Sequence, residues 1–373
     1  MNILLISDSL NRIGGNQRVT LSTIEALKEK NHIVCLCSLE KPDWELVEKI
    51  YGKVVTKPDL EKYIFKSRRE ITAYERMILP ILFLKCRKWA DLILDGFNLL
   101  TRTLAKEYIC YVTAAGLLQQ KHEKYDKGLW KIYITPLNAI DKLSIKTLNP
   151  QNIIANSNYT SMIVAKKFGS PAKVIHPPVK IEEFINSNRT KEDLVCCVGR
   201  FTKEKNYEAA IKAFKHVNNG KLVIMGGIIS KGSKLYVEEL KKLRDAMGLK
   251  GKVSFLINPP FEVIRDNLSR AKLYIHARKY EPFGISAVEA AASGCALIVH
   301  RSGGPYIDIV NYDRFGFSFE STNELSDNIN KLLEDEELCS EYSKKAIERS
   351  KMFSEDIFKK KLQEVISDRF KKS

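Results

Sequence analysis

Two successive series of alternating strand-like and helix-like segments constrain the fold more than any other feature of this chain. In the first series, short apolar runs lie at residues 3–6, 33–37, 92–94, 109–112 and 153–155. The second series starts again with apolar runs at residues 194–198, 221–225, 253–256, 273–276 and 296–300. Helical periodicity separates the runs, and such alternation indicates parallel sheets. Because 373 residues exceed one ordinary core, the sequence predicts an α/β protein with two doubly wound parallel-sheet domains.

The boundary between the predicted domains lies near the adjacent prolines Pro177 and Pro178. Proline interrupts regular elements, and the polar segment 181–193 that follows is interpreted as part of the linker. We therefore expect an N-terminal domain at residues 1–178 and a C-terminal domain at residues 179–353. The amphipathic tail, residues 354–373, is expected to form a helix that packs back across the linker onto the N-terminal domain.

Positive charge is concentrated in the first half of the chain. The net charge is +16, and residues 1–190 contain 29 basic and 19 acidic side chains. In segment 62–88, aromatic and aliphatic side chains alternate with basic ones, namely Lys62, Lys66, Arg68, Arg69, Arg76, Lys85, Arg87 and Lys88. Such a segment can bind an anionic membrane surface, or it can be a packed helix with a solvated basic face; the two interpretations carry equal weight. No nucleic-acid-binding module is recognisable, so a nucleic-acid partner is not expected.

The sequence shows no recognisable targeting or membrane-spanning segment. The first apolar run lacks the basic flank of a secretory signal, and the longest other candidate, residues 77–84, is far shorter than the roughly 20 residues of a spanning helix. Most of the eight cysteines lie in strand-like runs without C-x-x-C spacing, which is typical of reduced core thiols. We expect a cytoplasmic protein that associates peripherally with a membrane.

Two glutamates, Glu281 and Glu289, lie eight residues apart around a Pro-Phe-Gly turn. The turn keeps Glu281 in a loop, and the small residues that follow predict a helix containing Glu289. The amides of Phe283, Gly284 and Ile285 then lie at a helix N-terminus, where unpaired N–H groups and the helix dipole favour a diphosphate. Carboxylates offer acceptors to sugar hydroxyls. Two ordinary glutamates near a helix start are the simpler interpretation, but the turn and the following strand favour a sugar-nucleotide site.

A loop with basic residues follows the first strand-like run of the second domain and contains Gly199, Arg200 and Lys205. Ligands of open α/β sheets collect at the carboxyl edge of the strands. The Glu281 loop belongs to the same edge, where we place it two strands away. Arg200 and Lys205 can bind phosphate oxygens there. A solvated basic loop is the alternative, and the shared edge favours the diphosphate role.

A pair of glycines, Gly14 and Gly15, precedes Asn16 in the loop after the first strand-like run. Glycine allows a ligand to approach the backbone closely, although Gly-Gly alone is more often only a turn. The segment is not G-x-G-x-x-G, and no acidic residue ends the second strand-like run. A dinucleotide-dependent dehydrogenase is therefore disfavoured.

These loops and several further segments resemble one family along nearly the whole chain. The segments are 156–160, 175–179, 199–206, 222–227, 257–261, 281–289, 302–305 and 308–310. They resemble the GT-B glycosyltransferases of family 4, which are retaining enzymes with two Rossmann-like domains and a cleft between them. The likeness is closest to the α-1,2-mannosyltransferases that extend dolichol-linked oligosaccharide from GDP-mannose on the cytosolic membrane face.

The resemblance implies a role for individual residues. Arg200 and Lys205 would hold the donor diphosphate, Glu281 would bind the hexose and Glu289 the ribose. Further donor contacts would come from Gly15, Gly199, Ile257, Phe283, Gly284 and Ile285. The acceptor side of the first domain would contain Gly14, Asn16 and Thr113. The partners would be a nucleoside-diphosphate sugar, a lipid-linked or other glycan acceptor, and the anionic membrane.

The chain has no Asp-x-Asp motif, so cations and amides must neutralise the leaving diphosphate; no metal and no cofactor are expected. It also departs from the family after residues 109–112, where relatives commonly have a histidine and this chain has Thr113. A hydroxyl cannot relay protons near neutral pH. A retaining transfer in which the departing phosphate serves as the base would tolerate this change.

Three alternatives remain open at the level of sequence. The donor can be GDP-mannose, UDP-glucose or another UDP-sugar. The protein can be a nucleotide-sugar-binding protein that has lost turnover. It can also be a GT-B epimerase, although no set of first-domain acid and base groups is recognisable for that reaction.

Overall fold

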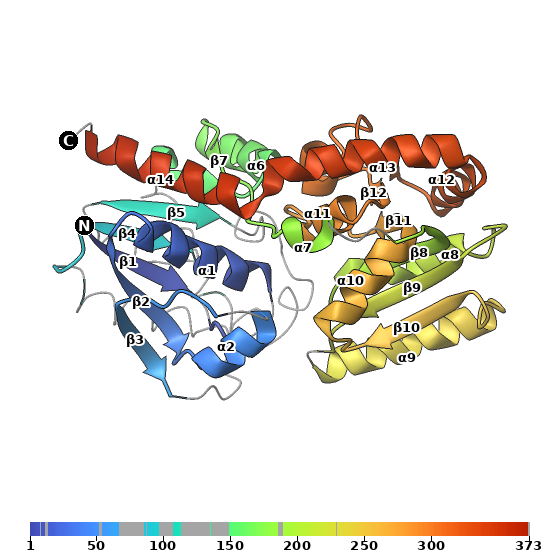
Figure 1. Cartoon of the computed structure of the whole chain (residues 1–373), viewed down its shortest axis with the longest axis horizontal. Coiled ribbons are helices and arrows are strands. Elements are labelled where there is room, and N and C mark those ends of the chain that lie inside the picture. Colours follow the sequence, from blue (N-terminus) through green and yellow to red (C-terminus); the bar gives the residue numbers. More distant parts are fainter. Residues whose placement is uncertain are drawn as a thin grey trace. The chain divides into compact units, whose positions relative to one another are not determined.

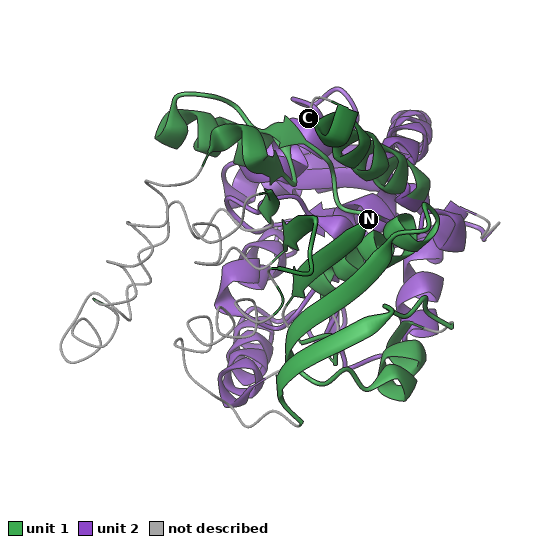
Figure 2. Ribbon diagram, turned by 90° about the vertical axis from the view of Figure 1, so that its left-hand side faces the viewer, with its two compact units in different colours: residues 1–178, 356–373 green, residues 179–355 purple. Residues whose placement is uncertain are grey.

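The computed structural model describes residues 1–7, 9–11, 14–51, 54–66, 86, 88–96, 107–112, 135, 149–185, 189–228 and 230–371. The chain divides into two compact units, coloured separately in Figure 2. Unit 1 comprises Met1–Pro178 and Asp356–Ser373, and unit 2 comprises Val179–Glu355. Each unit contains a parallel sheet, so the predicted α/β fold class is confirmed.

Unit 1 is built on a seven-stranded sheet with the order β3-β2-β1-β4-β5-β6-β7 (Figure 1). The strands are β1 (Asn2–Ser7), β2 (Ile33–Glu40), β3 (Leu60–Phe65), β4 (Leu92–Asp95), β5 (Tyr108–Val112), β6 (Ile153–Ala155) and β7 (Lys173–Val174). The apolar runs of β1, β2, β4, β5 and β6 are buried along most of their length, as in parallel sheets covered on both faces. The edge strands β3 and β7 are only half-buried or exposed. Strand order reverses between β1 and β4, which places a topological switch point at the carboxyl end of β1.

The last helix of the chain, α14 (Glu355–Lys371), belongs almost entirely to unit 1. Its residues Phe358, Leu362 and Ile366 are buried in the core of that unit. On the same helix, the Lys359 ammonium pairs with Glu25 of α1 (Gly15–Lys28) and with Glu29, the residue that follows α1. The other described helices of unit 1 are α2 (Trp44–Tyr51), η3 (Pro150–Asn152) and α6 (Asn158–Phe168).

Unit 2 is built on a six-stranded parallel sheet with the order β10-β9-β8-β11-β12-β13. The strands are β8 (Glu192–Val198), β9 (Lys221–Gly226), β10 (Val253–Ile257), β11 (Ala271–His276), β12 (Ala296–His300) and β13 (Phe317–Phe319). The chain runs outward from β8 to β10 and then returns to β11 on the other side of β8. The switch point of unit 2 therefore lies between β8 and β11.

The helices of unit 2 connect these strands and pack on the sheet. They are α7 (Glu182–Ile185), η4 (Lys203–Lys205), α8 (Tyr207–Ala213), α9 (Lys231–Ala246), α10 (Phe261–Arg270), α11 (Ile285–Ala292), η5 (Pro305–Ile309), α12 (Thr322–Glu334), α13 (Glu336–Ser350) and η6 (Lys351–Phe353). Ser230 and Ser321 begin α9 and α12 by accepting a hydrogen bond from the third helical amide.

The interpretation of segment 181–193 as a linker is wrong. Ile181 and Phe184 are buried in the core of unit 2, and Phe184 packs edge-on against Phe261. The polar residues around them mislead because α7 and the residue before it need only these two apolar side chains to dock on unit 2. The chain passes between the units at residues 178–179 and 355–356. Val179 forms a parallel bridge with Ser354, so the two passages lie side by side.

Among the described residues, no helix is both long and apolar enough to cross a membrane. Most of the basic segment 62–88 falls outside the described part of the chain, which includes only its residues 62–66, 86 and 88.

Candidate functional site

The candidate donor site lies at the switch point of unit 2. The loop after β8 contains Gly199, Arg200 and Lys205, and the loop after β11 contains Glu281. β8 and β11 are neighbouring parallel strands, so the expectation that the loops start two strands apart is wrong. The sequence order of the strands misleads here, because β9 and β10 lie on the far side of β8.

Glu281 is the centre of a buried group of charged side chains, which we call the Glu281 cluster: Lys205, His276, Arg278 and Glu281. Glu281 is 9% exposed. Its Oε2 atom accepts a hydrogen bond from the Lys205 ammonium at 2.7 Å and lies 3.3 Å from His276 Nε2. The Arg278 guanidinium donates to both carboxylate oxygens, at 3.2 and 3.3 Å. One carboxylate therefore meets three donors at the sheet edge.

The electrostatics of the cluster keep Glu281 ionised. Burial alone would raise the pKa of Glu281, but the Lys205 charge, the hydrogen bond with His276 and the Arg278 charge together hold it well below its usual range. Burial also lowers the pKa of His276, against the opposing effect of Glu281. A neutral His276 then donates from Nε2 to Glu281, which leaves Nδ1 as an acceptor facing the Tyr274 hydroxyl at 3.5 Å.

A second glycine-rich segment supports the Glu281 loop. The amide of Gly304 donates to the Glu281 carbonyl at 2.7 Å, and the amide of Tyr280 donates to the Ser302 hydroxyl at 2.9 Å. Gly303 has a φ of +76°, and a Cβ atom there would lie 2.5 Å from the Glu281 carbonyl oxygen. Only glycine permits this approach of two backbones.

The helix after Glu281 presents its N-terminus at the same edge. Gly284, with a φ of +101°, precedes α11, which begins at Ile285. The Phe283 side chain is buried against Phe353 in the core, so Phe283 can offer a ligand only its backbone. Amides of a first helical turn have no intrahelical acceptor. Glu289 lies in the second turn and is 6% exposed.

The β8 loop places two of its three basic residues, Arg200 and Lys205, in different surroundings. Lys205 is in contact with Glu281, whereas the Arg200 side chain is 53% exposed and pairs with Glu204 at 3.8 Å. Glu204 also lies 3.5 Å from the Arg278 guanidinium. An ionic chain therefore connects the exposed Arg200 with the buried carboxylate.

Gly199 brings the β8 loop close to its neighbours. A Cβ atom on Gly199 would lie 2.9 Å from the hydroxyl of Tyr207 and 3.2 Å from the Lys205 side chain. The Tyr207 hydroxyl is buried and has no hydrogen-bond partner among the described residues. The Tyr207 hydroxyl and the Lys205 side chain therefore fill the space beside Gly199.

The remaining predicted residues lie elsewhere. Ile257 ends β10 and is 38% exposed. In unit 1, Gly14 precedes α1 at the carboxyl end of β1, and Gly15 and Asn16 are exposed in its first turn. Thr113 is outside the described residues.

The sequence alone assigns no role to Arg278 or His276. Both occupy the end of β11 or the loop after it, three and five residues before Glu281. Their place at a carboxyl strand edge, close in sequence to an already chosen glutamate, was the signal that could have identified them.

Comparisons with known proteins identify relatives of both the sequence and the fold. The model of the family "Glycosyl transferases group 1" matches residues 179–349. The human GDP-Man:Man(3)GlcNAc(2)-PP-Dol alpha-1,2-mannosyltransferase is 32% identical over 200 residues, which cover 48% of this chain and 41% of that protein. This chain thus matches less than half the length of the human relative. The protein of the same name from Dictyostelium discoideum is 25% identical over 406 residues, with 92% of this chain and 80% of that protein covered.

A solved structure shares the fold over the whole chain. HepE from Anabaena, in complex with UDP, has a TM-score of 0.77 at 17% identity, with 99% of this chain and 100% of that chain covered. The likenesses confirm the GT-B fold and the resemblance found in the sequence.

Proposed function

We propose, from the match of residues 179–349 to the model of glycosyl transferases group 1, that the protein is a retaining, metal-independent glycosyltransferase. It transfers a hexose, mannose from GDP-mannose, to a lipid-linked or other glycan acceptor. The observation that carries this proposal is the ionised, buried Glu281 held by Lys205, His276 and Arg278 at the switch point of unit 2. A carboxylate kept charged in a buried place, at the sheet edge where ligands of open α/β sheets collect, suits hydroxyl recognition.

The charges of the site suit a sugar nucleotide. Around Glu281 and Glu204 lie three cations, Lys205, Arg200 and Arg278, so the group has a net positive charge. Only one of the three ammonium N–H groups of Lys205 is used by Glu281, and the others can donate to a diphosphate. Arg200, Gly199 and the first amides of α11 would complete the diphosphate site, while Glu289 binds the ribose and Ile257 flanks the base.

In the proposed reaction, the bond from the hexose anomeric carbon to the diphosphate breaks, and a bond to the acceptor oxygen forms on the same face. The proton of the acceptor hydroxyl passes to the departing phosphate, so no protein base is needed and Thr113 can occupy the usual histidine position. Positive charge at Lys205 and Arg200 stabilises the leaving diphosphate as its charge develops. Gly15 would contact the donor, and Gly14 and Asn16 would lie on the acceptor side.

GDP-mannose is favoured as donor because the sequence relatives are named for GDP-Man and α-1,2-mannosyl transfer. UDP-glucose is the second candidate, since HepE from Anabaena was also solved with UDP-glucose. The same relatives, named for a dolichol-linked acceptor, support a lipid-linked glycan as the acceptor. Peripheral attachment through segment 62–88 would bring such an acceptor to unit 1.

A transfer assay with each donor, in the presence of EDTA, tests the proposal. We expect hexosyl transfer from GDP-mannose, retention at the new linkage, and undiminished activity in EDTA. Glu281→Gln should lower turnover by about 100-fold or more, the order found for loss of one transition-state contact, with little change in nucleotide affinity. Activity that disappears in EDTA and returns with Mg²⁺ or Mn²⁺ would contradict the metal-free mechanism, and nucleotide binding without any turnover would favour a binding protein.

A further inference from the structure

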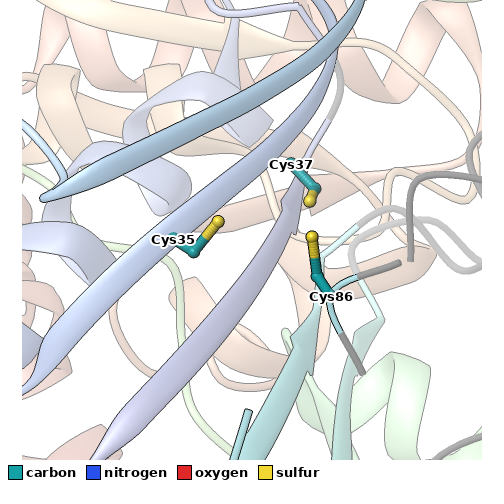
Figure 3. A group of neighbouring side chains, drawn as sticks. All are labelled: Cys35, Cys37 and Cys86. Carbon is teal, nitrogen blue, oxygen red and sulfur yellow. The ribbon is translucent and has the colours of Figure 1, made fainter. Parts of the chain in front are cut away.

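Three cysteines of unit 1 bring their sulfur atoms together on one face of the sheet (Figure 3). The Sγ atoms of Cys35, Cys37 and Cys86 all lie within 4.8 Å of one another. Cys35 and Cys37 are two residues apart on β2, so both point to the same face. Cys86 comes from the segment that precedes β4. We call these residues the three-cysteine cluster.

The cluster lies in an apolar environment with one cation nearby. Cys35 and Cys37 are each 1% exposed, and Cys86 is half-buried. On the neighbouring strand β1, Leu4 is in register with Cys35 and Ile6 with Cys37. On the other side of β2, Lys62 of β3 is in register with Cys37. An apolar pocket excludes the oxygen ligands that hard cations require, whereas thiolate sulfur binds soft ions.

The spacing of the sulfur atoms suits a single small ion. Three thiolates at about 2.3 Å from one ion lie about 4 Å from one another. The present spacing of no more than 4.8 Å needs changes of less than an ångström, which cysteine rotamers can supply.

We propose that Cys35, Cys37 and Cys86 bind one thiophilic d¹⁰ metal ion, Zn²⁺ or Cu⁺. Each ligating thiol releases its proton to solvent, and neither sulfur nor metal changes oxidation state. The described residues offer three sulfur ligands and no fourth protein ligand, which suits trigonal Cu⁺. Zn²⁺ would instead bind a water molecule as its fourth ligand, on the side of the half-buried Cys86. The positive charge of Lys62 offsets the excess negative charge of three thiolates.

The role of this ion would be structural. It would join β2 to the chain just before β4, on a unit that does not contain the Glu281 cluster. Failure of the metal proposal therefore leaves the glycosyltransferase proposal intact. The two proposals are also distinguishable by reagent, because Mg²⁺ and Mn²⁺ prefer oxygen ligands and would not fill a site made of thiolates.

The test uses the full chain, purified under reducing conditions and stripped of metal. Separate arms titrate it with Zn²⁺, with Cu⁺ and with Co²⁺ as a spectroscopic substitute for zinc. We expect one ion per chain, proton release on binding, and a sulfur-to-cobalt charge-transfer band. Cys35→Ser, Cys37→Ser and Cys86→Ser should each weaken binding at least about tenfold. Cys110→Ser, which removes another buried thiol of unit 1, should leave binding unchanged.

X-ray absorption of the metal-loaded wild-type chain gives an answer that does not depend on whether the variants fold. Three sulfur neighbours at about 2.3 Å support the site. A shell of only nitrogen and oxygen, binding of less than one ion per chain in both the Zn²⁺ and Cu⁺ arms, or equal loss of binding in Cys110→Ser would overturn it.

Discussion

At the scale of single residues, Arg200 and Lys205 of the β8 loop differ in their surroundings more than in their chemistry. Lys205 has a 14% exposed side chain and is paired with Glu281, whereas Arg200 is exposed and only loosely paired with Glu204. Arg200 can therefore turn toward a ligand without breaking a buried contact. Lys205 must keep its bond to Glu281 or leave that carboxylate partly unpaired, which is costly in a buried place.

Arg200→Ala is expected to weaken the binding of GDP or UDP by roughly 10- to 100-fold, because one charged hydrogen bond is worth about 1.5–3 kcal/mol. Calorimetric titration of the wild type and the variant with each nucleotide measures this change. Lys203→Ala is a matched control, since Lys203 is a 74% exposed cation of the same loop that pairs with Glu239. Equal affinity of wild type and Arg200→Ala would remove Arg200 from the diphosphate site.

His276 makes the stability of unit 2 depend on pH. Its pKa is lowered in the folded protein by burial, so below pH of about 6.5 the unfolded chain takes up a proton that the folded chain does not. The free energy of unfolding should therefore fall as the pH falls through this window, by up to about 1.4 kcal/mol per pH unit. The lowered pKa of Glu281 affects the free energy of unfolding only at lower pH, below about 4.3.

His276→Gln should flatten this dependence, because the amide can donate to Glu281 but does not titrate. Urea unfolding of wild type and variant at about pH 7.5 and about pH 5.5, within the window set by the histidine pKa, measures the difference. The same pH slope in both proteins would show that His276 is not the group responsible.

At the scale of elements, the Glu281 loop depends on the glycines of the segment before η5. Gly303→Ala would combine a positive φ with a Cβ atom 2.5 Å from the Glu281 carbonyl oxygen. We expect a loss of at least about 1 kcal/mol in the free energy of unfolding, with a larger proportional loss of transfer activity as Glu281 moves.

Chemical unfolding and initial-rate measurements on Gly303→Ala test this dependence. Gly251→Ala is the control, since a Cβ atom on Gly251 would have no neighbour within 4 Å. An active, wild-type-stable Gly303→Ala protein would show that the two loops do not need this backbone contact.

At the scale of the whole molecule, unit 1 is assembled from both ends of the chain. Arg369 of α14 pairs with Glu107 beside β5 and donates to Asn152 at 2.7 Å. The tail is thus part of the unit 1 core and not an appendage to unit 2. A membrane-binding surface on unit 1 would therefore belong to a unit whose core includes the last helix.

We predict that the whole protein binds anionic vesicles through segment 62–88 at low ionic strength and is released by salt, since such attraction is screened over about 8 Å at physiological ionic strength. Flotation with anionic and neutral vesicles measures binding. The test variant changes Arg68, Arg69, Arg87 and Lys88 to Ser. The control variant removes four exposed lysines of unit 2 by changing Lys231, Lys234, Lys242 and Lys250 to Ser. Failure of wild type to float with anionic vesicles, or equal loss in both variants, would leave the segment as a packed helix.

Local sequence determined much of this protein. Apolar runs such as residues 3–6 and 296–300 predict buried parallel strands because both faces of such strands are covered. The Glu281 turn predicts a loop and a following helix because proline and glycine act within a few residues of themselves. The domain pattern and the family likeness follow from the same local signals.

Only the tertiary structure decided which distant residues meet. The order of strands in a sheet is a nonlocal property, so local sequence does not predict that β8 pairs with β11. The contact of Lys205 with Glu281 depends on this pairing and is equally unpredictable. The docking of the α7 segment through two apolar residues also depends on contacts between distant segments. The approach of Cys86 to Cys35 and Cys37 does so too. In each case, pairing between segments far apart in sequence, rather than local propensity, sets the contact.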